Sequence, residues 1–153
     1  MPPTASLLHL DQQLCFALYS ASLAMTKAYR PLLAELGLTY PQYLVMLALW
    51  QHGPQGVTEL ADRLCLDSGT LTPLTKRMEA QGLIQRQRSN VDERQVEISL
   101  TTAGKKLKSR AEPLPLCMMQ LSGCQPPQLE TLTRELNALR DQLVANLKTA
   151  APL

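Results

Sequence analysis

The chain has 153 residues, of which 45% are hydrophobic and 18% are charged, and its formal net charge is +2. This composition is that of an ordinary globular protein of one domain, and the small net charge does not by itself indicate nucleic-acid binding. A membrane-spanning chain is excluded, because no stretch approaches the ~18–20 uninterrupted apolar residues that a span needs. The first residues lack the basic start and long apolar run of a signal peptide, so we expect a cytoplasmic protein.

The four cysteines are expected to be free thiols, which is their usual state in the cytoplasm. No two of them have the C-x-x-C spacing of a zinc site, and both histidines lie far from them in the sequence. The sequence therefore predicts neither a metal site nor another cofactor.

A long helix is predicted near the N-terminus, over residues 10–36. Apolar residues repeat there every three or four positions, which is typical of an amphipathic helix. Asp11 is the expected N-cap, and this places Cys15 within about the first turn. Pro31 is expected to kink or break the helix, and Gly37 is expected to end it.

Short helices are predicted next. A helix over residues 41–50 is followed by a turn at residues 53–56, and Thr58 is expected to cap a helix over residues 59–64. Asp67 or Ser68 is expected to cap the following helix, which ends near Gly82. The residues of these last two helices that should face the core are apolar: Leu60, Ala61, Leu64, Leu71, Leu74 and Met78.

Residues 83–88 and 94–100 alternate between apolar and polar side chains, which predicts two strands joined by a charged tip at residues 89–93. Two helices followed by such a ribbon make a winged helix-turn-helix, whose second helix enters the DNA major groove. Arg94 is expected to enter a minor groove, with its guanidinium oriented by Asp92. Taken alone, the second helix also fits an ordinary surface helix, and the ribbon is what favours DNA binding. The predicted DNA contacts are Asp67, Ser68, Gly69, Thr70, Thr72, Pro73, Lys76, Arg77, Arg86, Arg88, Asp92 and Arg94.

The last third of the chain is predicted to be helical again. A helix after Thr101 carries four basic residues and no acid, which favours a solvated face, and Pro113 and Pro115 interrupt it. A final amphipathic helix is predicted over residues 129–147. A small winged domain cannot bury the apolar stripes of both terminal regions, and a second copy of the chain can; a two-fold dimer also matches palindromic DNA.

The predicted fold is therefore mainly α with a small β-ribbon. It consists of a winged helix-turn-helix over residues 57–100 and a helical dimerisation region over residues 1–56 and 101–153. Double-stranded operator DNA and a second copy of the chain are the expected partners.

The runs LCFALYSA, GLTYPQYLVMLALW, LDSGTLTPLTKRMEAQGLI and DERQV resemble the MarR family of repressors, and within it the organic-hydroperoxide-resistance (OhrR) branch. The likeness extends almost continuously from Leu10 to Leu100 and weakens in the last third. It implies a homodimeric repressor, rather than an enzyme, that binds palindromic operator DNA when reduced. Organic hydroperoxide as inducer would release the DNA and derepress a peroxide-detoxifying gene.

The resemblance also implies that Cys15 is the peroxide sensor, in a pocket with Phe16, Tyr19, Tyr29 and Tyr40. The dipole of a helix N-terminus favours a thiolate, which is the nucleophile that attacks a peroxide. Tyr29 lies fourteen residues further on, about 21 Å along a straight helix, so contact with Cys15 requires the partner subunit. The alternative for Cys15 is the usual one for a free cysteine, a small buried hydrophobe.

The other cysteines are assigned less uniquely. Cys65 is expected to contribute to packing. Cys124 is slightly favoured over Cys117 as the thiol that captures an oxidised Cys15, although Gln120 occupies the position at which the family carries its resolving cysteine. A one-cysteine mechanism completed by a small-molecule thiol is the alternative.

Two other functions fit parts of the pattern. One is a thiol peroxidase that uses Cys15 catalytically, which would leave the basic residues of the winged unit without a purpose. The other is a MarR repressor that responds to a phenolic ligand in a pocket between Tyr19 and Trp50, without a redox step.

Overall fold

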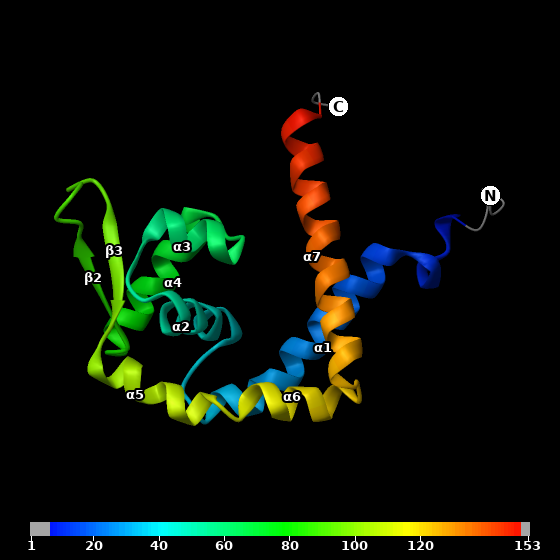
Figure 1. Cartoon of the computed structure of the whole chain (residues 1–153), viewed down its shortest axis with the longest axis horizontal. Helices are drawn as coiled ribbons and strands as arrows, with labels where there is room; N and C mark the ends of the chain where they lie inside the picture. The colour runs from blue at the N-terminus through cyan, green and yellow to red at the C-terminus, as the bar shows by residue number, and fades with distance from the viewer. Residues whose placement is uncertain (1–6, 151–153) are drawn as a thin grey trace. The chain divides into compact units, whose positions relative to one another are not determined.

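The computed structural model describes residues 7–150, so both ends of the predicted dimerisation region, 1–6 and 151–153, lie outside the described residues. The described chain is mostly helical with a small antiparallel sheet, which confirms the predicted fold class (Figure 1). Contacts divide the chain into two units, residues 1–112 and 113–153. The elements are η2 (Leu10–Gln12), α1 (Leu14–Ala34), α2 (Tyr40–His52), β1 (Gln55–Gly56), α3 (Val57–Leu64), α4 (Ser68–Ala80), β2 (Ile84–Arg88), β3 (Val96–Leu100), α5 (Thr102–Ala111), α6 (Leu114–Ser122) and α7 (Pro126–Thr149).

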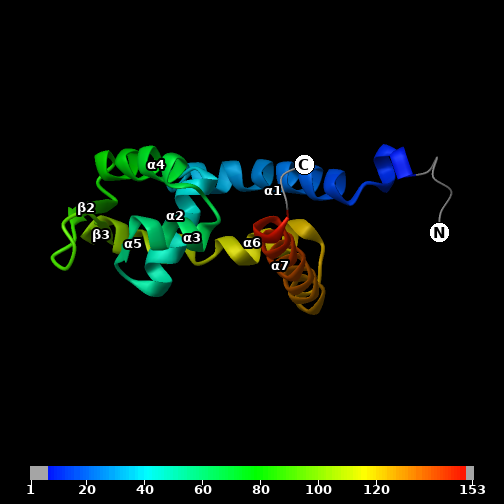
Figure 2. The ribbon, with the colours of Figure 1, turned by 90° about the horizontal axis from the view of Figure 1, so that it is seen from above.

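The first long helix, α1, begins later than its sequence predicts and is not broken where a break is expected. Asp11 lies in the short 3-10 turn η2, and Gln13 is the N-cap of α1 without a side-chain cap, so the predicted Asp11 cap is wrong. Pro31 lies inside the helix, which continues to Ala34. Its ring is exposed, so water can reach the carbonyl that its missing N–H leaves unpaired, while burial of Leu33 holds the last turn. The N-terminal half of α1 extends away from α2, α3 and α4 (Figure 2).

The second helix, α2, confirms the predicted helix and adds a residue or two at each end. Thr39 accepts a hydrogen bond from the Gln42 backbone N–H, and the Gln42 side chain accepts one from the Thr39 backbone. This capping box pairs two N–H groups that the start of a helix leaves free. At the other end, the Trp50 indole N–H donates to the carbonyl of Gly104 at 3.0 Å. Position 104 must be glycine, because a Cβ there would overlap the carbonyl oxygen of Leu83.

The predicted turn at residues 53–56 is partly wrong, because Gln55 and Gly56 form the short strand β1. β1 pairs with β3 at Gln55–Ile98 and Gly56–Glu97, and the sheet order is β1-β3-β2. The alternation of β2 and β3 is confirmed, with Ile84 and Ile98 buried. A two-residue strand has no periodicity to detect in a sequence, so only its pairing reveals it.

The N-cap of α4 is the predicted one, whereas that of α3 is not. Gly56, without a side-chain cap, precedes α3, so the predicted cap at Thr58 is wrong; that residue lies in the first turn. Asp67 caps α4 as predicted. The buried faces are confirmed except at Leu64, which is half-buried, and Thr75 joins them. The core of the first unit consists of the side chains that are at most 1% exposed: Leu33, Val45, Met46, Leu49, Leu60, Leu71, Thr75, Met78, Ile84 and Ile98.

The second unit consists of α6 and α7, separated by Gly123 at φ 68°. The predicted interruption is confirmed: Pro113 precedes α6, and Pro115 lies in its first turn. The final helix α7 begins at Pro126, three residues before its predicted start. α7 contains no buried residue. Its large exposed apolar side chains recur along the helix: Leu132, Leu136, Leu143, Val144 and Leu147.

Candidate nucleic-acid interface and thiol site

The start of α4 is held by a short hydrogen bond between the Asp67 carboxylate and the backbone N–H of Thr70, at 2.6 Å. That bond, with a second one from the Thr70 side chain, lowers the pKa of Asp67, so its carboxylate is charged at neutral pH. The predicted contact residues on α4 lie on its outer face. Exposed are Ser68, Gly69, Thr70, Pro73, Lys76 and Arg77, and Thr72 is half-buried.

The opposite face of α4 is closed. Leu71 and Met78 are fully buried, and so is Thr75, whose hydroxyl donates to the carbonyls of Leu71 and Thr72 at 3.1 Å. A buried hydroxyl that is paired inside its own helix costs little. The helix therefore presents a polar face to solvent, and its opposite face is packed in the core.

The predicted basic residues of the ribbon differ in exposure. Arg88 and Arg94 are exposed, whereas Arg86 is half-buried. The backbone N–H of Arg86 donates to the Glu79 carboxylate at 2.7 Å, which ties β2 to α4. Its Nε is buried and has no partner among the described residues.

The tip of the ribbon differs from the prediction in one contact. The Asp92 carboxylate accepts from the backbone N–H of Arg94 at 3.0 Å, and among residues 7–150 the structure records no ion pair between it and the Arg94 guanidinium. The Ser89 hydroxyl accepts from the backbone of Val91 in the same turn. Asp92 therefore shapes the turn, and the expected orientation of the guanidinium by Asp92 is wrong.

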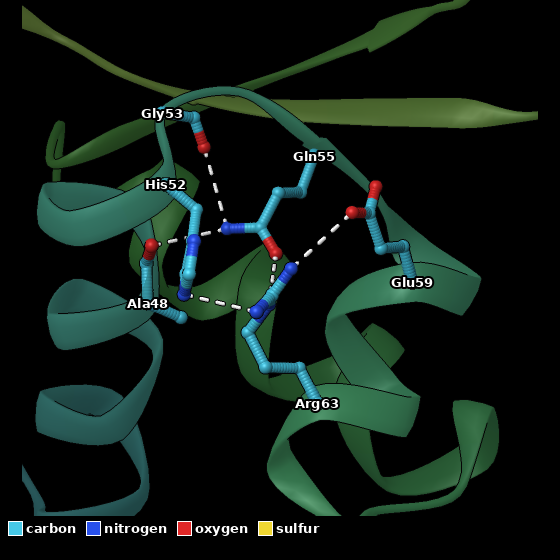
Figure 3. Close-up of polar contacts among 6 residues, drawn as sticks. All are labelled: Ala48, His52, Gly53, Gln55, Glu59 and Arg63. Atoms are coloured by element: carbon cyan, nitrogen blue, oxygen red, sulfur yellow. Dashed lines mark hydrogen bonds and ion pairs between the residues drawn. The ribbon is translucent and has the colours of Figure 1, made fainter.

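Arg63 of α3 makes contacts with α2 and β1 that the sequence did not indicate (Figure 3). Its Nε donates to the Gln55 side chain at 2.8 Å, its Nη1 lies 2.9 Å from His52 Nε2, and its Nη2 lies 3.4 Å from Glu59. Gln55 is 3% exposed and donates to the carbonyls of Ala48 and Gly53. This network joins α2, β1 and α3. The only signal in the sequence is the spacing of four residues between Glu59 and Arg63.

Cys15 is the second residue of α1 and is exposed, as are its predicted neighbours Phe16 and Tyr19. Its place in the first turn is confirmed although the predicted cap is wrong. The alternative of a small buried hydrophobe does not hold in the described chain. Further exposed apolar residues, Leu14 and Leu23 among them, continue along the same half of the helix.

The other two predicted pocket residues belong to a cluster of three tyrosines. The ring centroid of Tyr29 lies 5.0 Å from that of Tyr40 and 5.8 Å from that of Tyr43, which is 2% exposed and which the sequence interpretation did not include. The spacing of Tyr40 and Tyr43, one helical turn, is the signal that would have found it. Burial, with smaller contributions from the neighbouring phenols, raises the pKa of Tyr29 to about 12, and burial also raises the pKa of Tyr40 and of Tyr43. All three are neutral hydrogen-bond donors at physiological pH.

These tyrosines and Trp50 do not form one pocket with Tyr19. Tyr19 is 64% exposed and makes no ring contact with the cluster among the described residues. Trp50 lies ten residues beyond Tyr40 on α2, about 15 Å along the helix axis. A single phenolic-ligand pocket from Tyr19 to Trp50 is therefore not formed by the described chain.

The remaining cysteines are also free thiols. Cys65 is exposed at the end of α3, at φ 57°, so the predicted packing role is wrong. Cys117 and Cys124 are half-buried in the second unit. The Cys124 backbone N–H donates to the Ser122 hydroxyl at 3.1 Å.

No helix within residues 7–150 is both long and apolar enough to cross a membrane.

The MarR family model matches residues 38–96 of the chain. The organic hydroperoxide resistance transcriptional regulator of Bacillus subtilis (strain 168) is 50% identical over 134 residues, which cover 88% of this chain and 91% of that protein. The chain belongs to the MarR family. It is therefore a DNA-binding transcriptional regulator of the OhrR type, in agreement with the prediction of a regulator rather than an enzyme.

Another family member has been solved in two redox states. AbfR of Staphylococcus epidermidis has been solved in its reduced form bound to DNA, and that chain is 34% identical, with a TM-score of 0.68 and coverage of 88% of this chain and 93% of that one. A disulfide-formed AbfR is 37% identical, with a TM-score of 0.59 and coverage of 85% and 91%. Like this MarR-family chain, AbfR therefore has the winged-helix fold, and it exists in reduced and disulfide-bonded states.

Proposed function

We propose that the protein is a homodimeric repressor that senses organic hydroperoxides through Cys15 and releases its operator when that thiol is oxidised. The observation that carries the proposal is the exposed Cys15 thiol in the first turn of α1, among exposed apolar and aromatic side chains. Such a site is open to a small apolar oxidant, and the N-terminal dipole of the helix favours the thiolate that reacts with it.

The reaction has two steps, oxidation of Cys15 and formation of a disulfide. The Cys15 thiolate attacks the terminal oxygen of the hydroperoxide, the O–O bond breaks, and the alkoxide leaves and takes up a proton. Cys15 is oxidised to a sulfenic acid and the peroxide is reduced to an alcohol. A second thiol then attacks the sulfenic sulfur, a disulfide forms, and water is released.

The dimer is formed by the exposed apolar side chains of the N-terminal and C-terminal helices. Leu132, Leu136 and Leu143 of α7 are between 41% and 54% exposed, and Leu14 and Leu23 of α1 are 58% and 55% exposed. Exposed apolar stripes of this extent mark protein–protein interfaces, and a two-fold arrangement presents two copies of α4 to a palindrome.

The tyrosine cluster of one subunit completes the sensor of the other. Tyr29 is too far along α1 to reach Cys15 of its own chain. Tyr29 and Tyr40 are neutral phenols whose ring centroids lie 5.0 Å apart. A neutral phenol donates a hydrogen bond to a thiolate or to a peroxide oxygen, which would orient the peroxide for attack.

DNA binding is assigned to the outer face of α4 and to the ribbon. The exposed Lys76 and Arg77 contact phosphates or base edges in the major groove, and Arg94 enters the flanking minor groove. The predicted contact Arg86 has a second function in this scheme, because its backbone joins β2 to α4 through Glu79.

The second thiol is Cys124, with Cys117 as the alternative. Both are half-buried in the second unit, and the related AbfR forms a disulfide. Formation of this bond between subunits would change the separation of the two recognition helices and so release the DNA.

The test uses a duplex selected by the wild-type protein from a random pool. Cys15→Ser should bind this duplex as tightly as wild type but should not be released by cumene hydroperoxide. Cys65→Ser, which removes an exposed thiol from the DNA-binding region, is the matched control and should respond like wild type. Release of the Cys15→Ser protein by the peroxide would refute the sensor assignment.

Non-reducing peptide mass analysis of the same samples identifies the second thiol. A Cys15–Cys124 peptide is expected in wild type and should be lost in Cys124→Ser. A Cys15–Cys117 peptide would instead assign the role to Cys117, and a small-thiol adduct on Cys15 would replace the two-cysteine mechanism.

A further inference from the structure

The ribbon formed by β2 and β3 is joined to α4 by a short turn (Figure 1). α4 ends at Ala80, the chain reverses at Gly82 with φ 78°, and β2 begins at Ile84. The backbone N–H of Leu83 donates to the carbonyl of Met78 at 3.1 Å. This bond fixes where the ribbon begins. It lies too close to the start of β2 to fix the direction in which the strand leaves the helix.

A second contact lies further along the strand. The Glu79 carboxylate accepts a hydrogen bond from the backbone N–H of Arg86 at 2.7 Å. Among residues 7–150, it is the only hydrogen bond that joins β2 to α4. β2 is an edge strand, because the sheet order is β1-β3-β2, and the outer N–H groups of an edge strand have no strand partner. The Glu79 carboxylate therefore supplies the acceptor that a further strand would provide.

The Glu79 side chain makes no other polar contact within the described chain. It is exposed in the last turn of α4, and the structure records no ion pair for it among residues 7–150. A carboxylate on a helix that binds DNA repels the phosphates and by itself lowers affinity. A hydrogen bond to an ionised carboxylate is stronger than one between neutral groups. The contact with the ribbon is therefore what an acid at this position contributes.

The contact lies where it can control the position of the ribbon tip. Val91, in the tip, is five residues beyond Arg86, which is up to about 17 Å along an extended strand. A rotation of the ribbon by about 10° at Arg86 would move the tip by about 3 Å, roughly half the width of the minor groove. The angle between β2 and α4 therefore decides whether Arg94 and the outer face of α4 can reach adjacent grooves together.

We propose that Glu79 is a positioning residue for DNA binding, and that its bond to the Arg86 backbone sets the angle between the ribbon and α4. At this angle Arg94 reaches the minor groove while Lys76 and Arg77 contact the major groove. Without the bond, DNA binding must order the ribbon, and this ordering reduces affinity. The proposal rests on the DNA contacts assigned above and does not depend on the redox step.

The experiment compares two substitutions that remove the same charge. Glu79→Gln keeps an oxygen that can accept from the Arg86 N–H, whereas Glu79→Ala has no acceptor. Both are measured as reduced protein on the duplex selected by wild type, and Glu79→Ala should bind about tenfold more weakly than Glu79→Gln. Glu97→Gln and Glu97→Ala, at an exposed acid of β3, are the controls and should bind alike. Equal affinities of the two Glu79 variants would overturn the proposal.

Footprinting identifies the contact that is lost. Hydroxyl radicals report the sugars that line the minor groove, and dimethyl sulfate reports guanine N7 in the major groove. In the Glu79→Ala complex, protection of the flanking minor groove should weaken while the guanines under α4 stay protected. Equal loss of both protections would show that α4 itself is displaced, which contradicts a role through the ribbon.

A double-mutant cycle with Arg94 tests whether Glu79 acts through the tip. Arg94→Ala alone should weaken DNA binding. In that background Glu79→Ala and Glu79→Gln should bind equally, because the tip no longer contributes. A tenfold difference that persists without Arg94 would refute the positioning role. Binding is measured at a temperature at which circular dichroism shows every variant to be folded, so the comparison does not depend on stability.

The same cycle separates this proposal from the DNA contacts on which it rests. Arg94→Ala protein that binds like wild type would refute the assigned minor-groove contact, and the positioning role with it. Weaker binding by Arg94→Ala together with equal affinities of the two Glu79 variants would leave the DNA contacts intact and refute the positioning role alone.

Discussion

The winged unit and the terminal helices use apolar residues in opposite ways. In the winged unit, Leu60, Leu71, Ile84 and Ile98 are at most 1% exposed, and polar residues form the outer face of α4. In the terminal helices the apolar residues are outside: α7 has no buried residue, and the first half of α1 exposes one large side chain after another. The first region is a finished core, and the second is a surface that a second chain would complete. Stability of the first should therefore be independent of protein concentration, whereas association should depend on the second.

The largest effect is expected from a substitution in the finished core. Leu60→Ala removes a side chain that is 0% exposed and should lower the free energy of unfolding by about 2–5 kcal/mol. Urea unfolding should show this loss at every protein concentration. A loss below ~1 kcal/mol would mean that the winged unit is packed more loosely than its burial indicates.

A substitution in the exposed stripe should act on association instead. Leu143→Gln removes apolar burial at the proposed dimer interface and should weaken the dimer by about 1.5–3 kcal/mol, roughly a 10–150-fold change. Sedimentation equilibrium measures this change. Gln142→Ala, at a neighbouring exposed position, is the control and should associate like wild type. If Leu143→Gln associates as strongly as the control, α7 does not form the interface.

The contacts of Arg63 are expected to stabilise the packing of the winged unit against α2. Arg63→Ala leaves the buried oxygen of Gln55 without its donor and should cost about 1–3 kcal/mol. Chemical unfolding measures the cost. Arg77→Ala is the comparison: this arginine lies on the outer face of α4, so DNA affinity should fall while stability stays within ~0.5 kcal/mol of wild type. A stability loss in Arg77→Ala as large as in Arg63→Ala would remove the distinction between the two arginines.

The smallest effect is expected at alkaline pH, in the tyrosine cluster. Burial raises the pKa of Tyr29 from 10.0 to about 12, so the folded chain retains a proton that the unfolded chain loses. This contribution to stability is complete below pH 10 and is lost as the pH rises toward 12. The free energy of unfolding of Tyr29→Phe should therefore fall less steeply with pH between pH 10 and 12 than that of wild type. Tyr19→Phe, at an exposed position, should show the pH dependence of wild type. Equal pH dependence in all three proteins would contradict the burial of Tyr29.

Contacts between near neighbours in the chain were predictable. The Asp67 cap bonds to a residue three positions on, the alternation of β2 and β3 reports which side faces the core, and the leucine spacing predicts the buried side of α4. The position of Cys15 was also predictable, since a helix start is a local feature. Errors arose at Asp11 and Thr58 because both helices begin without a side-chain cap: their N-caps are Gln13 and Gly56, and neither makes a capping hydrogen bond.

The sequence by itself determined the order of the main helices and of the β2–β3 ribbon, the polar face of α4 and the family, because each depends on residue types at short spacing. Only the tertiary structure decided which distant residues meet. Folding brings together distant chain segments, and on this depend the pairing of Gln55 with Ile98, the Arg63 contacts and the third tyrosine of the cluster. The exposure of Cys65 is of the same kind, because burial is a property of everything packed around a residue and has no local signature in the sequence.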